Sequence, residues 1–459
     1  MRGSRGPVGP GTIGRRRFVQ STLATTLCAA LPAGRLWADA GSTEAGTASI
    51  PALDRSGKPL VLTRSDVRQF AASLKGGLLE AGQDGYDTAR KLWNGSFDRH
   101  PVLIARCAGA PDVVQAVNFA RSTGIVTAVR GGGHSISGQS VCDGGLVIDL
   151  SSMKGIRVDA AAKTARAQPG VLLGELDRET QASGLITTLG TASDTGIAGL
   201  TLGGGLGRLA RKYGFTCDNV RSVEIVTADG KLLRASAKEN SDLYWAVRGG
   251  GGNFGVVTEF EYQLHTFGPN VLGGIVVFPF SDARKVLTAL TEFTENAPDE
   301  MYLNPLITAG AAPAGRAVGF EVCYCGPIAE GERLLAPLRK LGKVLDDNIG
   351  EKTYLEVQSS FDPGLPSGRG YYFKSGFMPR VTAPMVDELV DTFSKAPASL
   401  MSVPMIHLGG AAGRVKPEAT AFWNRDAHHD LPCGPRGRTA RTTKESSPRC
   451  AASGGSSST

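Results

Sequence analysis

The sequence predicts an α+β fold built from two parts with different patterns. From Val102 to Leu264, short apolar runs typical of strands alternate with stretches that have helical spacing. Beyond about residue 270, longer strand-like runs are separated by amphipathic segments, which predicts an antiparallel sheet with helices on one face. At 459 residues, the chain is long enough for about two or three domains that each bury a hydrophobic core.

The first part begins with a strand-helix-strand unit. Residues 102–105 are strand-like, residues 111–120 have helical spacing with Pro111 suited to the first turn, and residues 126–129 are strand-like again. The other elements predicted in this part are strands at 146–150, 156–158 and 256–264, a helix at 174–183 closed by Gly184, a hairpin of 223–227 and 231–234 around Asp229-Gly230, and a short helix capped by Ser241.

The second part contains longer elements. The predicted strands are 271–278, 302–308, 317–324 and 402–408, and the predicted helices are 281–296, which Ser281 would cap, 329–341 and 383–395.

A histidine inside a glycine-rich turn is the most informative feature of the chain. Residues 130–138 read Arg-Gly-Gly-Gly-His-Ser-Ile-Ser-Gly and follow the predicted strand 126–129. Gly131, Gly132 and Gly133 leave backbone amides bare enough for a phosphate to approach closely. The turn lacks the lysine of a Walker loop, which argues against nucleoside triphosphate hydrolysis. We therefore expect a cofactor at His134.

Two further glycine clusters follow in the same part. In the cluster from Gly196 to Gly207, the residues Gly205, Gly207 and Ala210 satisfy G-x-G-x-x-A. Residues 190–202 are rich in Gly, Thr and Ser and do not read as a buried strand, so this pattern does not favour a Rossmann dinucleotide site. With the third cluster, at 249–255, the chain has three such loops, which predicts backbone lining an extended ligand from several sides.

The formal charge of +7 is concentrated at the two ends of the chain. Residues 1–40 carry six arginines and one aspartate, and residues 432–459 carry five basic residues and one glutamate, so the body between them is slightly acidic. A nucleic-acid track needs basic residues gathered on one face, and the composition therefore argues against nucleic-acid binding.

Residues 1–40 resemble a twin-arginine export signal. Arg15, Arg16 and Arg17 precede Phe18-Val19, a weakly apolar stretch at 21–33 follows, and Ala38-Asp39-Ala40 offers a cleavage site. The stretch is too short and too rich in threonine for a membrane span. We expect the protein to engage the twin-arginine export machinery and to reach the periplasm or the extracellular space.

Residues 432–459 contain no Leu, Ile, Val, Met, Phe, Tyr or Trp. Such a segment cannot bury a core, so we expect it to be disordered. The abrupt change of composition resembles a shifted reading frame or an unnatural truncation.

Five of the eight cysteines lie in the body of the chain. Cys323 and Cys325 have neither a second cysteine pair nor a nearby histidine to complete a zinc site. We therefore expect buried free thiols and no metal site.

From Trp93-Asn94 to Leu264 the chain resembles the FAD-binding domain of the berberine bridge enzyme-like oxidases, which belong to the PCMH-type superfamily of vanillyl-alcohol oxidase. The residues that carry the resemblance are 130–135, 145–151, 203–205, 211–214, 218–219, 242–245 and 248–255. It implies a two-subdomain FAD-binding domain at 60–268 and a substrate domain at 269–431.

The resemblance implies FAD bound covalently through His134, which in the family bonds to the 8α-methyl of the flavin. A neutral imidazole is a competent nucleophile near neutral pH. Many members carry a second tether, a cysteine where this chain has Ala192, so we expect a single link. The cofactor-binding residues expected are Arg130, Gly131, Gly132, Gly133, His134, Ser135, Gly138, Gln139, Thr195, Gly196, Gly199, Leu202, Gly203, Gly204, Gly205, Gly207, Asp218 and Val257.

In the substrate domain, Tyr371, Tyr372 and Lys374 resemble the segment that faces the substrate, and we expect Tyr372 and Lys374 to bind it. The match continues to residues 425–427. The catalytic base of the family usually lies beyond that point, so no base is identified.

These observations predict an exported FAD-dependent oxidoreductase that takes hydride from a sugar, an alcohol or an amine, with oxygen as the expected electron acceptor. Two alternatives stay open. A flavin-binding protein without turnover, a ligand binder or a degraded remnant, would be yellow but inactive. A nicotinamide-dependent dehydrogenase built on the Gly205 pattern would bind NAD and be colourless.

Overall fold

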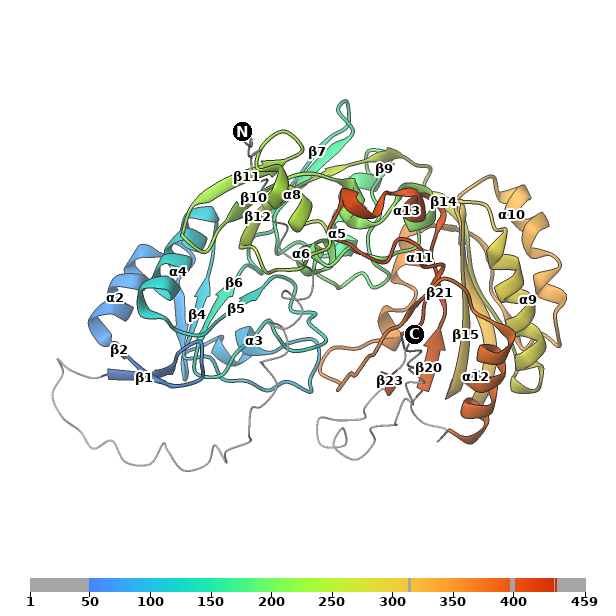
Figure 1. The fold of residues 1–459 in the computed structure, drawn as a ribbon, viewed down its shortest axis with the longest axis horizontal. Helices are drawn as coiled ribbons and strands as arrows, with labels where there is room; N and C mark the ends of the chain where they lie inside the picture. Colours follow the sequence, from blue (N-terminus) through green and yellow to red (C-terminus); the bar gives the residue numbers. More distant parts are fainter. Residues whose placement is uncertain (1–48, 313–314, 397–400, 433, 436–459) are drawn as a thin grey trace, which may run out of the picture. The chain divides into compact units, whose positions relative to one another are not determined.

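The computed structural model describes residues 49–312, 315–396, 401–432 and 434–435 (Figure 1). The expected export signal at 1–40 lies outside the described residues. So does the expected tail, except for residue 432 and the short strand β23 (Gly434–Pro435), which pairs with β20 (Met401–Pro404).

The N-terminal subdomain contains a four-stranded sheet in the order β3-β4-β6-β5. β4 (Leu103–Arg106) and β5 (Thr127–Arg130) both run parallel to β6 (Leu146–Asp149), and α4 (Ala110–Thr123) connects β4 to β5. β6 is buried over its whole length, as expected for the central strand of a parallel set. The remaining elements are β1 (Ser49–Leu53), β2 (Pro59–Thr63), α2 (Arg64–Ser73), β3 (Leu78–Glu80) and α3 (Tyr86–Arg90).

The second subdomain is a five-stranded antiparallel sheet in the order β11-β10-β12-β8-β7. The predicted hairpin is confirmed, because β10 (Val220–Val226) pairs with β11 (Leu232–Ser236) and Gly230 between them has φ +80°. The other elements are β7 (Ile156–Asp159), β8 (Thr164–Ala167), α5 (Leu173–Gln181), β9 (Leu185–Ile186), α6 (Ile197–Leu202), α7 (Ala210–Tyr213), η1 (Thr216–Asn219), α8 (Ser241–Ala246), β12 (Val256–Gln263) and β13 (His265–Thr266).

The C-terminal part is built on a seven-stranded sheet whose long strands are β14 (Asn270–Pro279), β16 (Gly315–Tyr324) and β15 (Met301–Ala312). Figure 1 shows α9 (Ala283–Glu295), α10 (Ile328–Leu335) and α12 (Ala383–Lys395) on one face of this sheet. Leu287 and Leu290 of α9 share a buried core with Leu303 and Phe320 of the sheet. The predicted α+β class, with an antiparallel sheet covered by helices, is confirmed.

Shorter elements complete the C-terminal part. They are η2 (Phe280–Asp282), η3 (Leu338–Lys340), β17 (Asp346–Asp347), β18 (Gly350–Thr353), α11 (Tyr354–Ser359), η4 (Asp362–Gly364), β19 (Phe377–Met378), β21 (Ile406–His407), α13 (Gly410–Arg414), η5 (Pro417–Ala419) and β22 (His429–Asp430).

Some predicted element ends were wrong for local reasons. Asp282 rather than Ser281 precedes α9, because residues 280–282 form a 3-10 turn. The residue before α8 is Asn240, in a left-handed conformation, and Ser241 is the first helical residue. The predicted helix 329–341 is divided, since α10 ends at Leu335 and Pro337 precedes η3.

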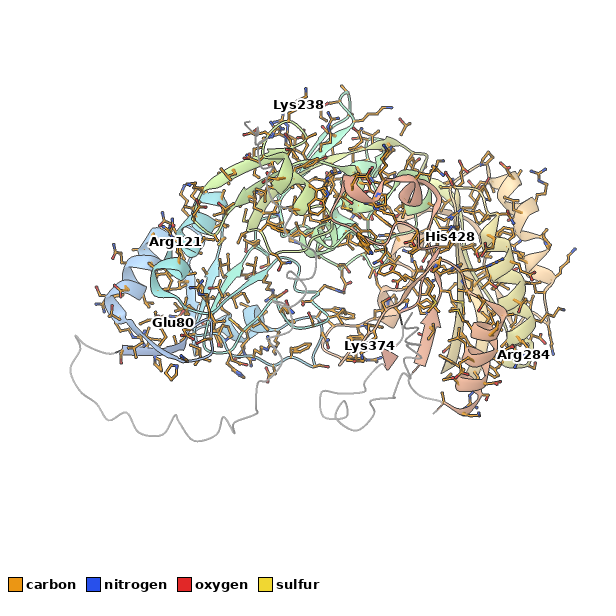
Figure 2. The ribbon with its side chains drawn as sticks, viewed as in Figure 1. Glu80, Arg121, Lys238, Arg284, Lys374 and His428 are labelled. Carbon is orange, nitrogen blue, oxygen red and sulfur yellow. The ribbon has the colours of Figure 1, made fainter. Side chains whose placement is uncertain are left out.

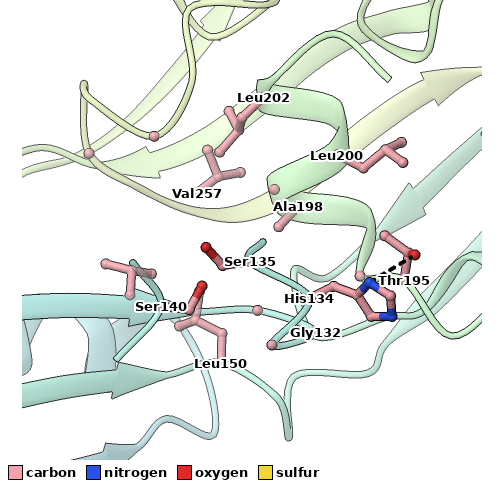
Figure 3. Close-up of a pocket in the computed structure, with 17 residues that line it drawn as sticks. Gly132, His134, Ser135, Ser140, Leu150, Thr195, Ala198, Leu200, Leu202 and Val257 are labelled. Carbon is pink, nitrogen blue, oxygen red and sulfur yellow. Dashed lines mark hydrogen bonds between the residues drawn. The ribbon is translucent and has the colours of Figure 1, made fainter. Parts of the chain in front are cut away.

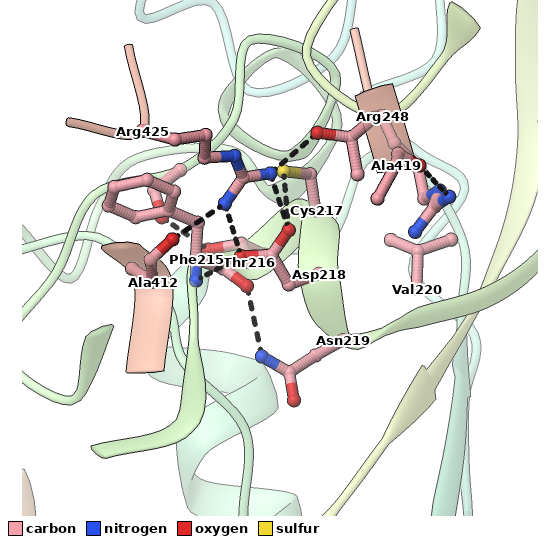
Figure 4. A network of polar contacts seen from close by, with 12 residues as sticks. Phe215, Thr216, Cys217, Asp218, Asn219, Val220, Arg248, Ala412, Ala419 and Arg425 are labelled. Carbon is pink, nitrogen blue, oxygen red and sulfur yellow. Dashed lines mark hydrogen bonds and ion pairs between the residues drawn. The ribbon is translucent and has the colours of Figure 1, made fainter. Parts of the chain in front are cut away.

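Two buried arginines join residues 49–264 to the C-terminal part. The guanidinium of Arg208, whose side chain is completely buried, donates to Glu321 at 2.7 Å and to Gln358 at 2.9 Å. Arg425 makes two parallel bonds of 2.7 Å to the carboxylate of Asp218 (Figure 4). Each arginine is held at several points, so the contacts fix the geometry of the junction.

Among the described residues, no helix is both long and apolar enough to cross a membrane.

Candidate functional site

A cavity of about 420 Å³ lies where β5, α6 and the start of β12 meet (Figure 3). Its lining is mostly apolar or glycine, with three hydroxyl side chains and one imidazole. The residues that line it are Val129, Gly131, Gly132, Gly133, His134, Ser135, Ser140, Leu150, Thr195, Gly196, Ala198, Gly199, Leu200, Leu202, Gly252, Gly255 and Val257.

Two glycines let the histidine loop and the start of α6 approach closely. A Cβ on Gly132 would lie 2.5 Å from the Cα of Gly196, and a Cβ on Gly196 would lie 2.5 Å from the amide nitrogen of Gly132. Gly133 has φ +72°, which side chains rarely tolerate. These glycines therefore bring the backbone amides beyond β5 to the cavity wall, and a side chain at any of the three positions would cause a clash or backbone strain.

Gly199 and Gly252 are glycines for a different reason. A Cβ added at either position would meet no protein atom within 4 Å, although both residues line the cavity. Both are exposed. No packing inside the protein explains glycine there, whereas a ligand lying against the bare backbone does.

A second cavity, of about 410 Å³, adjoins the first. The two share Val129, Gly252 and Gly255 as lining residues. The second extends along α4 and β5 toward Arg121, and it also reaches Phe254 of the third glycine cluster. Residues of all three glycine clusters line the first cavity, and the third cluster also lines the second.

The imidazole of His134 lies at one end of the first cavity. Its Nε2 is 3.0 Å from Oδ1 of Asp194, and its Nδ1 is 3.5 Å from the hydroxyl of Thr195, which lines the cavity (Figure 3). Burial lowers the pKa of His134 below its usual value, while the carboxylates of Asp194 and Asp362 oppose that shift. The ring is therefore neutral near pH 7, in the form that can act as a nucleophile.

The C-terminal part holds this histidine from the other side. The ring of Trp93 stacks on His134 at 4.2 Å between centroids and on Tyr371 at 3.9 Å. The amide of Asn94 donates to the carbonyl of Tyr371 at 2.8 Å, and the backbone N–H of Tyr371 donates back at 2.9 Å. The carboxylate of Asp362 accepts from the backbone N–H of Ser193 at 3.0 Å and also binds its hydroxyl.

Ten of the expected cofactor residues line the cavity, and eight lie outside its wall. Arg130 binds the carbonyl of Ala89 through its guanidinium. Gln139 is exposed, and its backbone N–H donates to the Ser135 hydroxyl at 3.1 Å. The glycines outside the wall are Gly138, which faces the ring of Phe97, Gly203 at the end of α6, Gly204, which faces Phe422, Gly205, which faces Thr216, and Gly207, which faces the carbonyl of Leu189.

Asp218 is the remaining residue outside the cavity wall. Besides Arg425, its carboxylate accepts from the backbone N–H of Phe215 at 2.9 Å. The Arg425 guanidinium also donates to the hydroxyl of Thr420, and it lies 5.2 Å from the ring centroids of both Phe215 and Phe422. In this structure Asp218 therefore forms an internal ion pair.

The G-x-G-x-x-A pattern at Gly205 does not form a Rossmann site. The segment before it is the helix α6, not a strand. Protein atoms occupy the space beside Gly205 and Gly207, which leaves no room there for a dinucleotide. The sequence argument against that site is confirmed.

Seven cavity residues were absent from the expected set: Val129, Ser140, Leu150, Ala198, Leu200, Gly252 and Gly255. The two glycines belong to the third cluster, which the sequence did single out. Val129 and Leu150 lie at or just beyond the ends of neighbouring parallel strands, a position where ligands commonly bind. Ala198 and Leu200 belong to the helix α6, which was not predicted because residues 190–202 are rich in Gly, Thr and Ser.

The expected substrate residues lie in the loop between η4 and β19. Tyr372 is 49% exposed and Lys374 is exposed (Figure 2), whereas Tyr371 is buried in the stack with Trp93. Neither Tyr372 nor Lys374 lines the two cavities described above. Their role in substrate binding stays a prediction.

The first cavity fits the flavin cofactor that the sequence predicts. No acidic side chain is among its lining residues, so an anionic pyrophosphate meets bare amides and hydroxyl groups instead of carboxylates. Its apolar wall suits a ring system. Among the described residues, no group of His, Cys, Asp or Glu is placed to hold a metal ion.

The cysteines of the described chain, Cys107, Cys142, Cys217, Cys323 and Cys325, are free thiols. Burial raises the pKa of Cys217 to about 12, so this thiol stays protonated and unreactive. The prediction of buried free thiols is confirmed for these residues, of which Cys325 is only partly buried.

Comparison with known proteins identifies the family of this chain. A family model described as an FAD binding domain matches residues 101–236. The (R)-6-hydroxynicotine oxidase of Paenarthrobacter nicotinovorans is 35% identical over 366 residues, which cover 77% of this chain and 78% of that protein.

Solved structures agree with the sequence comparison. The glucooligosaccharide oxidase of Acremonium strictum, described as having a novel flavinylation, has a TM-score of 0.75 at 25% identity and covers 84% of this chain and 83% of its own. The berberine bridge enzyme-like protein 1 of Physcomitrella patens shares the fold, with a TM-score of 0.74 at 24% identity, covering 82% of this chain and 84% of its own. The chain belongs to the PCMH-type family of FAD-dependent oxidoreductases that includes the berberine bridge enzyme-like proteins and 6-hydroxynicotine oxidase.

Proposed function

We propose that the protein is an oxidase of a small organic substrate, a sugar, an alcohol or an amine, with FAD attached covalently through His134 and oxygen as the electron acceptor. The observation that carries the proposal is a neutral, largely buried imidazole at the end of a cavity whose glycines leave space for a ligand. The activities named for relatives that oxidise oligosaccharides and hydroxynicotine support the substrate classes.

Each part of the cavity has a task in this proposal. The amides of Gly131, Gly132 and Gly133 bind the pyrophosphate, because they follow β5 without side chains that would obstruct an anion. Leu150, Leu202 and Val257 exclude water from the wall of the cavity. When bound, the flavin supplies the chemistry of hydride acceptance, while the protein supplies orientation and electrostatics.

The tether is single in this proposal. Ala192 stands where a second attachment through cysteine would be made, and the buried thiol of Cys217 lies on η1, outside the cavity lining. For the location of the protein, the twin-arginine pattern of residues 15–19 supports export.

Replacing His134 tests the proposed tether. Wild-type protein precipitated with acid should keep its yellow colour in the pellet, and His134→Ala should release nearly all of it to the supernatant, because no other cavity residue offers a nucleophilic nitrogen. Absorbance near 450 nm, measured in both fractions, decides the outcome.

His265→Ala is the matched control. His265 is also a partly buried histidine of the same domain, with Nε2 2.7 Å from Asn219 and its ring stacked on Tyr213, but it does not line the cavity. Its pellet should stay yellow. Equal retention of colour by wild type and His134→Ala would show that the assigned tether is wrong.

Turnover separates an oxidase from a flavin protein without activity. Sugars, alcohols and amines are offered to the purified protein, and peroxide is measured. An oxidase produces peroxide with at least one class, whereas a binder stays silent although dithionite bleaches its flavin. A colourless protein that binds NAD would favour the nicotinamide alternative.

A further inference from the structure

Asp194 is the polar partner of the imidazole nitrogen that faces away from Thr195. Nε2 of His134 lies 3.0 Å from its Oδ1, within ordinary hydrogen-bond distance, while Nδ1 lies at the long distance of 3.5 Å from the Thr195 hydroxyl. The His134 side chain is 14% exposed and that of Asp194 is 45% exposed. The histidine is enclosed and its acidic partner stays hydrated.

This geometry selects one tautomer of the neutral ring. A carboxylate only accepts hydrogen bonds, so the proton of a neutral imidazole is placed on Nε2, where it can donate to Asp194. Nδ1 then carries the free lone pair. It lies beside Thr195, a residue of the cavity wall, and the long contact with the hydroxyl leaves that lone pair only weakly held.

The orientation of the ring is fixed as well. Trp93 stacks on its face at 4.2 Å, and Tyr371 backs Trp93 at 3.9 Å. The segment that carries Asp194 is anchored one residue earlier, where Ser193 binds the carboxylate of Asp362. A ring held only by stacking could flip about its Cβ–Cγ bond, which would exchange its two edges. The hydrogen bond to Asp194 is therefore the contact that decides which nitrogen faces the cavity.

We propose that Asp194 is the positioning residue for flavin attachment: it holds the proton on Nε2 of His134 and presents Nδ1 as the atom that forms the covalent bond. The inference rests on the proposed covalent link through His134 and adds to it the side chain that orients the ring, Asp194.

A bond forms between Nδ1 of His134 and the 8α carbon of the flavin, and one C–H bond of the 8-methyl group is broken. The carbon releases one proton as this C–H bond breaks. The imidazole releases a second proton from Nε2, through Asp194 to solvent, so that Nε2 of the substituted ring carries no proton. Two electrons remain on the flavin and pass to dioxygen, and the two protons released complete hydrogen peroxide.

Asp194 also influences when the ring is neutral. The charged groups that act on His134 are Asp194 and Asp362, and both oppose the effect of burial on its pKa. Removing Asp194 therefore lowers the pKa of His134 further. Attachment in such a variant should persist to lower pH than in the wild type, although its maximum rate is smaller.

The experiment follows attachment directly. Flavin-free protein from riboflavin-starved cells is mixed with FAD in aerated buffer, quenched with acid at intervals, and the flavin in the pellet is measured between about pH 4 and 8. An FAD analogue without the 8-methyl group, which cannot be attached, gives the non-covalent affinity of each variant.

Asp194→Ala should attach FAD about tenfold more slowly or worse at the pH of its maximum, with its acid midpoint shifted to lower pH and the affinity for the analogue within about threefold of wild type. Asp194→Asn should recover much of the rate, because its amide oxygen still accepts a bond from Nε2–H. Asp229→Ala, which removes an exposed carboxylate of a hairpin, should match the wild type.

Unchanged rate and midpoint in Asp194→Ala would overturn the inference and leave the covalent link standing. So would a loss of analogue affinity equal to the loss of rate, since that indicates a structural role. A wild-type protein that binds the analogue but never retains FAD in the pellet would overturn the proposed link, and the inference with it.

Discussion

Two glycine-rich regions of this protein look alike in sequence and differ in what occupies the space beside them. In the first, here called the cavity glycines, Gly199 and Gly252 face open space. In the second, the filled loop of residues 203–207, Gly204 faces the ring of Phe422 and Gly207 faces the carbonyl of Leu189. The bare backbone thus leaves space for a ligand in one region, and in the other it allows the protein's own atoms to pack closely.

The filled loop depends on a residue more than 200 positions away in the chain. Phe422 lies against Gly204 and packs 4.8 Å from Phe215, and the guanidinium of Arg425 lies over both rings. Asp218 holds that guanidinium with two bonds. Mutations in the two regions should therefore separate stability from flavin binding.

The largest effect is expected for Asp218→Ala. Arg425 is only 4% exposed, and an unpaired buried charge costs about 3–5 kcal/mol of unfolding free energy. Urea denaturation measures the loss. Asp218→Asn should cost less, because its amide oxygen still accepts one bond. If Asp218→Ala is as stable as wild type but has lost FAD, the residue binds the cofactor and our assignment to the filled loop is wrong.

A smaller loss of stability is expected for Gly207→Ala. The added Cβ would overlap the carbonyl of Leu189, which is backbone and cannot turn aside, so the unfolding free energy should fall by about 1–3 kcal/mol. Thermal unfolding with FAD in excess detects it. If Gly207→Ala has the melting temperature of the wild type, the space between Gly207 and the carbonyl of Leu189 is larger than the structure shows.

The smallest change of stability is expected for Gly199→Leu. Its side chain enters empty space, so the apoprotein should unfold within about 1 kcal/mol of wild type. The variant should nevertheless be purified without flavin, because the leucine occupies the cavity. Gly199→Ala, with one added carbon, is the graded control. Full yellow colour in Gly199→Leu would contradict a ligand site beside α6.

Much of the fold followed from local pattern. The hairpin at Asp229-Gly230 and α12, whose bounds match residues 383–395, formed as expected because their turn residues and apolar spacing act over a few positions. The helix α6 was missed, since its six residues include a glycine and a threonine and its stability comes from burial of Ile197 and Leu202.

The candidate site divides in the same way. The sequence pointed to His134 and the glycines before it, because that combination of backbone freedom and one imidazole is informative by itself. It could not separate Gly199 from Gly204, which are both glycines in one cluster, nor identify Asp218 as the partner of Arg425.

The chain alone thus determined the secondary-structure classes, the family resemblance and the histidine at which to seek a cofactor, because each depends on residues close together in sequence. Only the tertiary structure decided which glycines face open space, which side chain lies beside each nitrogen of His134, and that Asp218 is paired. Those properties depend on what fills the neighbouring space, and Phe422, Arg425 and Tyr371 reach that space from distant parts of the chain.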